Sequence, residues 1–343
     1  MEYAIKTKNI GLVSGPLSFI LVINFFHPEG LTLEANAILA STVWMAIWWI
    51  TEAIPISVTA LLPIILFPLS GGLELSETTA SFGHKYVFLY LGGFIIAIAM
   101  QKWNLHKRIA LNIISFIGTD VVKIILGFMV ATAFLSMWIS NTATAVMMLP
   151  IAMAIVDQLK DNPNTIENEN KIFGKALMLG IAYSASIGGI STLIGTPPNL
   201  ILAGVVEETF GYEITFATWF KFGFPISLIL LFLCWKYLTG IAFKFEQKSF
   251  PGGQKEIRNQ LQKLGQITYE EKLVASIFAM TAIAWVTRDF ILKLIIPVID
   301  DTIIVMISAI IIFLLPNKNR KRRDRKSTRL NSSHSSVSRM PSS

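Results

Sequence analysis

The segment IILGFMVATAFLSMWISNTATAVMMLPIAMAIV, residues 124–156, decides the fold because it carries no charged side chain over 33 residues. A straight helix of that length would be about 50 Å long, whereas the hydrocarbon core of a bilayer is about 30 Å thick. Its centre holds Ser136 and Ser140-Asn141-Thr142 where a spanning helix would carry leucine. We therefore predict a re-entrant helical hairpin folded at Ser140–Thr142, with a tilted spanning helix packed through small residues as the alternative.

The charged residues beside this segment indicate that both of its ends lie on one face of a membrane. Lys123 precedes the segment, and Asp157 follows it directly. Two arms of about 22 Å each would pass the midplane without crossing the bilayer. The hairpin is expected to enter and leave from the cytoplasmic side.

The composition of the whole chain indicates a membrane protein. Of the 343 residues, 53% are hydrophobic and 15% are charged, whereas soluble domains carry about 25% charged residues. These values argue against a soluble enzyme and, despite a net charge of +7, against a nucleic-acid partner. The single cysteine, Cys234, excludes an intrachain disulfide and a multi-thiolate metal site.

Enzyme chemistry has no support in the sequence. The four histidines are scattered and none belongs to a His-Glu-x-x-His pattern, so a zinc site is not expected. An intramembrane hydrolase would need such a pattern, paired aspartates or a Ser/His dyad at membrane depth. His106 lies in a basic stretch, residues 101–108, that is typical of the cytoplasmic interface. We predict that the protein is not an enzyme.

The distribution of basic residues predicts the orientation. Lys6 and Lys8 precede the first apolar run, residues 10–26, while Glu29 and Glu34 follow it, which predicts a cytoplasmic N-terminus. Further apolar runs follow at residues 35–50, 53–69 and 86–100. If each of these runs crosses the bilayer, the basic stretch 101–108 is also cytoplasmic. The chain is expected to be a multi-pass protein of the cell (inner) membrane, with the lipid bilayer as a partner.

A second uncharged segment, residues 176–206, is interrupted by helix-breaking residues. These are Gly180, Gly188, Gly189, Gly195, Pro197 and Pro198. Glycine and proline at this density stop a helix within residues 188–198 and let it restart near Asn199. Irregular backbone persists at membrane depth only where it is buried in protein or lines a wet cavity. We predict a broken helix.

The two interruptions, residues 136–144 and 191–199, are polar but contain no Asp, Glu, Lys or Arg. Helix N-termini suit an anion, and unwound carbonyls, hydroxyls and an amide oxygen suit a hard cation such as Na⁺. Proton-driven carriers usually keep an ionisable residue at membrane depth. The pattern therefore favours transport of an anion together with Na⁺.

Three motifs in a fixed order resemble a known family. They are WWITEAIPISVTALLPIILFP at residues 48–68, Ser140-Asn141-Thr142 within SNTATAVMMLP, and Gly195-Thr196-Pro197-Pro198-Asn199. This combination is similar to the divalent-anion:sodium symporter family of dicarboxylate, citrate and sulfate carriers, and covers about residues 10–316. The resemblance implies an all-α, multi-span transporter with two inverted repeats, each holding a re-entrant hairpin and a broken helix. It also implies a homodimer.

The resemblance implies the site residues as well. Sodium would be held by Ser136, Ser140, Asn141 and Gly195. A substrate carboxylate would contact Ser140, Asn141 and Thr142, and the broken helix would be supported by Thr196, Pro197, Pro198 and Asn199. No cofactor is expected beyond Na⁺ as coupling ion. Thr144 is expected to be a packing residue bonded to a backbone carbonyl, a role that is also the alternative for Ser136.

The chain holds one Ser-Asn-Thr, although the family carries two. Trp285-Val286-Thr287-Arg288 weakly resembles Trp49-Ile50-Thr51-Glu52, so a second repeat is expected to begin and then stop. The expected divisions are 1–34 with the first transmembrane helix, 35–240 as the first repeat with hairpin 124–156 and broken helix 176–206, a cytoplasmic loop 241–272, the start of a second repeat 273–316, and a basic, Ser-rich, disordered, non-native tail 317–343. We expect a truncated fragment.

The expected function is sodium-coupled symport of a C4-dicarboxylate or citrate. Two alternatives remain: a related carrier for sulfate, arsenite or Na⁺/H⁺ exchange, or a truncated product without activity.

Overall fold

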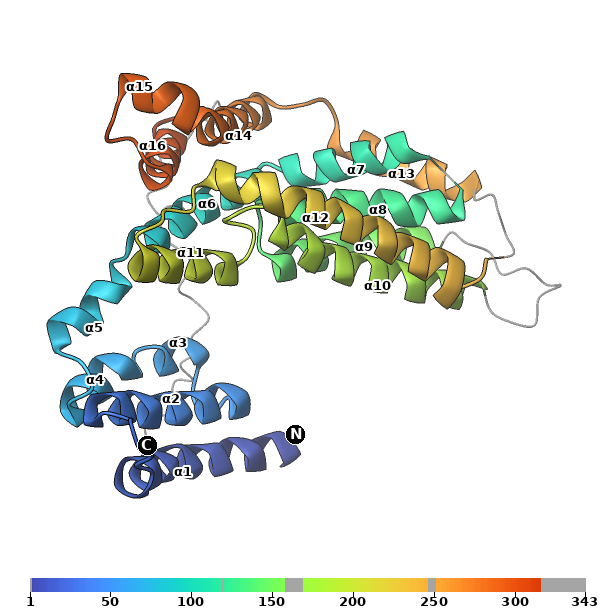
Figure 1. Cartoon of the computed structure of the whole chain (residues 1–343). Helices are drawn as coiled ribbons and strands as arrows, with labels where there is room; N and C mark the ends of the chain where they lie inside the picture. Colours follow the sequence, from blue (N-terminus) through green and yellow to red (C-terminus); the bar gives the residue numbers. More distant parts are fainter. Residues whose placement is uncertain (1, 119, 158–168, 246–250, 316–343) are drawn as a thin grey trace, which may run out of the picture. The chain divides into compact units, whose positions relative to one another are not determined.

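The computed structural model describes residues 2–118, 120–157, 169–245 and 251–315. Every element within these ranges is helical (Figure 1). Six stretches there are long and apolar enough to cross a bilayer. They are Thr7–Phe25, Leu33–Thr51, Leu75–Lys102, Lys171–Ile190, Phe216–Ala242 and Tyr269–Ile295. The prediction of an all-α, multi-span membrane protein is confirmed, and the predicted tail lies outside the described residues.

The chain divides into two compact units, residues 1–88 and 89–343. The first unit contains α1 (Glu2–Phe25), α2 (Leu33–Thr51), α3 (Ile56–Thr59), α4 (Leu62–Ser70) and α5 (Leu75–Phe82). Helix α1 packs closely on α2. Gly11 permits this approach, because a Cβ at that position would overlap the Thr51 side chain. The Trp48 indole Nε1 donates to Gly11 O at 2.9 Å. Glu52 pairs with Lys8 at 3.8 Å.

The apolar run 53–69, expected to be one crossing, forms two short helices instead. Helix α3 ends at Thr59 and α4 begins at Leu62. Pro63, in the first turn of α4, has no N–H to continue the preceding helix, and its ring clashes with the turn before it. The argument that places residues 101–108 in the cytoplasm counts the run 53–69 as one crossing, and two short helices do not support that count.

The second unit is built around α8. Its helices are α6 (Lys85–Lys102, which begins in the first unit), α7 (Leu105–Ile117), α8 (Val121–Ser136), α9 (Asn141–Val156), α10 (Glu169–Ile190), α11 (Pro197–Phe210), α12 (Phe216–Tyr237), α13 (Pro251–Leu264), α14 (Tyr269–Thr287), α15 (Lys293–Ile295) and α16 (Asp301–Leu314), with π-helical turns at Leu238–Ala242 and Arg288–Leu292. Helices α8, α9, α10 and α12 lie side by side (Figure 1). Most side chains of α8 are buried, among them Phe128 and Met129. Gly188 of α10 packs on the Ala133 backbone, with no space for a Cβ.

Two amphipathic helices, α7 and α13, lie where the sequence predicted an interfacial stretch and a loop. Arg108 of α7 pairs with Glu271 of α14 at 3.2 Å. It also donates to Leu264 O at 3.3 Å and to Gly265 O at 3.1 Å, at the end of α13. One guanidinium group thus holds α7 to the junction between α13 and α14, so residues 241–272 are not simply a loop.

His106, in the basic stretch 101–108, is buried within the protein. Its side chain is 4% exposed, and its Nδ1 lies 3.1 Å from Met100 O. Burial lowers the pKa of His106, because the imidazolium loses its hydration. The residue is part of the packed interior of the second unit.

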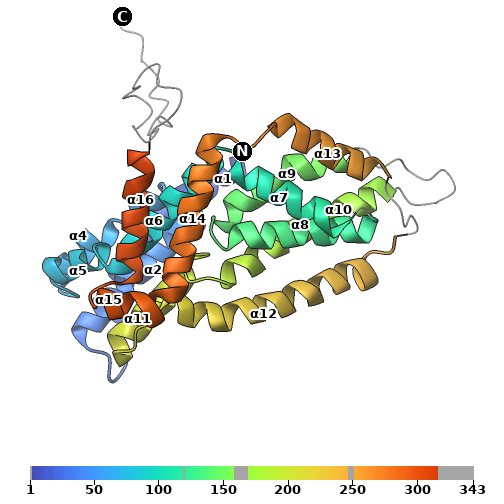
Figure 2. The ribbon, with the colours of Figure 1, turned by 90° about the horizontal axis from the view of Figure 1, so that it is seen from above.

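The region of the expected second repeat begins at Tyr269, where Thr268 and Glu271 form a capping box, four residues before the predicted start. Helices α14 and α16 lie side by side (Figure 2). The buried Arg288 pairs with Glu213 at 2.8 Å and with Asp301 at 3.3 Å. Asp301 also accepts a hydrogen bond from Phe216 N at 2.7 Å, which holds the start of α12 to α16.

Candidate functional site

The segment 124–156 forms two helices, and α9 packs back against α8. The chain turns at residues 137–140. Asn141 and Thr142 are therefore the first residues of α9, whereas the sequence predicted that they lie in the turn. The reason is local. Ser140 is the N-cap of α9, and its hydroxyl accepts a hydrogen bond from Ala143 N at 3.3 Å.

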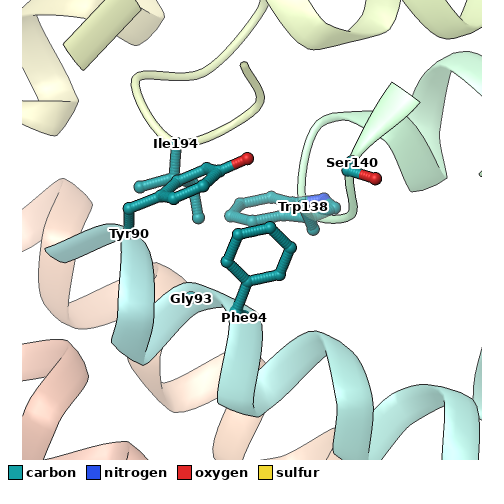
Figure 3. Close-up of a pocket in the computed structure, with 6 residues that line it drawn as sticks. All are labelled: Tyr90, Gly93, Phe94, Trp138, Ser140 and Ile194. Carbon is teal, nitrogen blue, oxygen red and sulfur yellow. The ribbon is translucent and has the colours of Figure 1, made fainter. Parts of the chain in front are cut away.

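Aromatic side chains surround the turn between α8 and α9. The Trp138 ring lies 4.8 Å from Phe278 in an edge-on contact and is stacked 5.9 Å from Phe216. It also lines a cavity of about 10 Å³, room for about one water molecule. Tyr90 and Phe94 of α6 lie beside it in Figure 3, and the cavity is completed by Gly93, Ser140 and Ile194.

The second interruption separates α10 from α11. Residues 191–196 are non-helical, and Thr196 is the N-cap of α11 in an extended conformation. Pro197 and Pro198 occupy the first two helical positions, where no N–H donor is required, so the helix restarts two residues before the predicted Asn199. The buried Asn199 amide donates to Gly189 O at 2.9 Å and to Thr192 O at 2.8 Å, which bridges the break.

Ser136, at the end of α8, contacts both α9 and α10. Its hydroxyl oxygen lies 2.6 Å from Ala185 O and 2.7 Å from Asn141 Oδ1. A hydroxyl has one hydrogen, so it satisfies only one of these two acceptors at a time. Oxygens from α8, α9 and α10 thus meet at the Ser136 hydroxyl, which has one hydrogen for two acceptors. Oxygen-rich groups of this kind fit hard cations.

Glycines allow the two interruptions to approach each other. A Cβ at Gly189 would overlap the Asn141 amide, and a Cβ at Gly195 would lie 2.5 Å from Gly189 O. The structure therefore brings Ser136 and Asn141 into contact. Gly195 packs against the backbone of Gly189, which in turn packs against the Asn141 amide. The hydroxyl of Ser140 is turned to the first turn of α9, where it acts as a cap.

Two threonines of α9 differ in environment. Thr142 is exposed in the first turn, where the backbone N–H groups carry partial positive charge. Thr144 is fully buried and, among the described residues, its hydroxyl has no hydrogen-bond partner. The expected bond from Thr144 to a backbone carbonyl is therefore wrong, although its packing position was predicted.

Sequence reasoning missed the contribution of α10 to the site. The Ala185 carbonyl carries no sequence signal, because every residue has a carbonyl. The sequence pattern predicts a helix break from Gly188-Gly189 onward, whereas both residues are helical and allow close packing. Thr192, which donates to Met137 O, was noted only as part of a polar stretch.

Comparisons with known proteins identify related transporters. Residues 6–318 match the sodium:sulfate symporter transmembrane region. The sodium-dependent dicarboxylate transporter SdcS of Staphylococcus aureus (strain USA300) is 48% identical over 321 residues, which cover 92% of this chain and 62% of that protein. The protein of the same name from strain bovine RF122 / ET3-1 matches with the same identity and coverage.

The chain thus spans 62% of the length of these curated relatives. The family consists of symporters, in agreement with the prediction of a transporter rather than an enzyme. Because the match extends over most of the chain, this protein belongs to the divalent-anion:sodium symporter family.

Proposed function

We propose that this chain carries one half of a site for sodium-coupled symport of C4-dicarboxylates. The observation that carries the proposal is the group of three oxygens, Ser136 Oγ, Asn141 Oδ1 and Ala185 O, in which the single hydroxyl hydrogen of Ser136 faces two acceptors. The relatives are named sodium-dependent dicarboxylate transporters, which supports both the ion and the substrate class. Na⁺ and the dicarboxylate are both cargo in this proposal.

Each residue of the half-site has a role. Ser136, Ser140, Asn141 and Gly195 hold Na⁺, together with the Ala185 carbonyl that faces Ser136. Ser140, Asn141 and Thr142 contact one substrate carboxylate at the start of α9, where helix N–H groups stabilise an anion. Asn141 serves both because its amide offers an oxygen to the cation and an N–H to the carboxylate. Thr196, Pro197, Pro198 and Asn199 maintain the break that exposes this backbone.

The test is a thermal unfolding experiment on the purified chain in lipid nanodiscs. Na⁺ is titrated at constant ionic strength with choline, and K⁺ is titrated in parallel. A ligand that binds only the folded state raises the Tm. We expect Na⁺ to raise the Tm and K⁺ to have no such effect. Identical curves in Na⁺, K⁺ and choline would overturn the proposal.

Sulfate is the second candidate anion, because the matching family region is described as a sodium:sulfate symporter. Succinate and sulfate are each added at saturating Na⁺. We expect succinate to raise the Tm further than sulfate. A larger effect of sulfate would reverse the order of the two candidates.

We also propose that the protein lies in the inner membrane with a cytoplasmic N-terminus, that the hairpin is re-entrant from the cytoplasm, and that the parent protein is a homodimer. Cysteines introduced at Lys123 and Asp157, in a Cys234→Ser background, should both react with an impermeant reagent from the cytoplasmic side. Labelling of the two positions from opposite faces would show that the hairpin crosses the bilayer.

A further inference from the structure

At the C-terminal end of α10, all four of the last carbonyl groups have identified donors. A helix end leaves four carbonyls without an intrahelical partner. Ser191 N donates to Gly188 O at 3.0 Å, and Asn199 Nδ2 donates to Gly189 O at 2.9 Å. The carbonyls of Ile187 and Ile190 are paired by side chains from another helix.

Those side chains belong to one face of α12. Trp219 Nε1 donates to Ile190 O at 2.9 Å, and Ser227 Oγ donates to Ile187 O at 2.9 Å. Between them, a Cβ at Gly223 would lie 2.6 Å from Ile190 O, so glycine permits the close approach of the two helices. The spacing of four residues places the three positions in one row along the helix.

The same end of α10 faces the proposed Na⁺ site with its other groups. The Ala185 carbonyl is 2.6 Å from the Ser136 hydroxyl, and Gly189 packs on the Asn141 amide. In a helix, hydrogen bonds between successive turns couple the orientations of neighbouring peptide groups. Fixing the carbonyls of Ile187 and Ile190 on α12 therefore also fixes the direction of the groups that face Ser136 and Asn141.

We propose that Trp219 and Ser227 are positioning residues for the Na⁺ site. They do not contact the ion; they hold the end of α10 so that the Ala185 carbonyl and the Asn141 amide keep the geometry that the ion requires. Ligands held in place before binding give higher affinity, because less ordering is required when the ion arrives. This inference rests on the proposed function.

The chain offers a matched control on the same helix. Trp235 is also half-buried, and its Nε1 donates to Val122 O at 3.1 Å, at the other end of α8 from Ser136. Trp219→Phe and Trp235→Phe thus remove the same indole N–H from the same kind of bond. For Ser227→Ala, the control is Thr239→Ala, whose hydroxyl donates to Trp235 O at 2.8 Å.

The measurement is the Na⁺ concentration that gives half of the maximal rise in Tm. We expect Trp219→Phe and Ser227→Ala each to raise this concentration about fivefold, the effect of one hydrogen bond. The two controls should stay within about twofold of the wild type. Ser227→Thr keeps a hydroxyl and should restore the wild-type value. A purely structural role would lower the Tm in choline and leave the half-saturating concentration unchanged.

The outcomes separate the two proposals. A wild-type chain that does not respond to Na⁺ would overturn the proposed function and this inference with it. A wild-type response combined with equal half-saturation in Trp219→Phe and Trp235→Phe would overturn the inference alone. If Trp219→Phe does not fold in choline, the pair Ser227→Ala and Ser227→Thr decides: equal values in that pair would reject the positioning role.

Discussion

The turn between α8 and α9 and the break between α10 and α11 interrupt helices by different means. In the turn, local bonds predominate: Ile139 N donates to Leu135 O at 3.0 Å and Ser140 caps α9, while the Thr192 side chain donates to Met137 O from outside the turn. The break depends on side chains from outside it, including Asn199 and Trp219. The turn therefore offers mainly side-chain groups to the proposed ligands, whereas the break offers mainly backbone groups. Substitutions in the turn should change binding, and substitutions around the break should change folding as well.

The largest expected effect is the loss of the Na⁺ response in Asn141→Ala. The amide contributes to the shared oxygen group and contacts Gly189, but it is not required to close the turn. We expect the rise in Tm with Na⁺ to disappear while the Tm in choline changes little. In a full-length relative with the same Ser-Asn-Thr motif, Na⁺-driven uptake should be abolished with normal membrane insertion. A retained Na⁺ response would remove Asn141 from the site.

The next effect is on folding, in Asn199→Ala. This change leaves Gly189 O without the amide donor and takes one of two donors from Thr192 O, which keeps Gly195 N, so it should cost about 1–3 kcal/mol. The free energy of unfolding is measured in mixed micelles with a denaturing detergent. The matched control is Asn112→Ala, whose exposed amide donates to Arg108 O at 2.9 Å and should cost under ~1 kcal/mol. Equal costs would contradict the proposed dependence of the break on Asn199.

Two adjacent glycines sharpen the comparison. A Cβ at Gly188 meets the Ala133 backbone, which cannot rotate away, so Gly188→Ala should destabilise the protein by about 1–3 kcal/mol. A Cβ at Gly189 meets only the Asn141 side chain among its three nearest atoms, so Gly189→Ala should weaken Na⁺ binding about tenfold with little loss of stability. The measurements are unfolding and Na⁺ titration of both variants. The opposite pattern would assign the wrong glycine to the site.

The sequence predicted the two interruptions but not how they meet. The uncharged length of residues 124–156 and the prolines at 197 and 198 are local signals, and the structure has helix ends within a few residues of both. The contact of Ser136 with Ala185 depends on the register between α8 and α10. That register is set by packing between the helices, such as Gly188 on Ala133. Ser136 and Ala185 are 49 positions apart, so no local sequence signal predicts their contact.

The two similar tetrapeptides show the same limit. Thr51 and Thr287 each donate to the carbonyl four residues earlier, at 2.7 Å in both cases, so the local structure follows the sequence. Their surroundings differ: Trp49 is 45% exposed, whereas Trp285 is 2% exposed and donates to Asp301 O. Burial depends on which helices pack nearby, and the repeat of four residues does not contain that information.

The smallest expected effect concerns Thr144, beside the turn. Its hydroxyl is fully buried and unpartnered among the described residues, so it lacks the hydrogen bonds that it would make to water in the unfolded chain. Thr144→Val removes this group at nearly constant shape and should leave the free energy of unfolding unchanged or raise it by up to ~1 kcal/mol. Ser136→Ala, which removes a partnered hydroxyl, should instead cost about 1–3 kcal/mol. Both variants are unfolded in choline and again in Na⁺. If Thr144→Val costs as much as Ser136→Ala, and only in Na⁺, the Thr144 hydroxyl binds the ion, and the site extends one turn further along α9 than proposed.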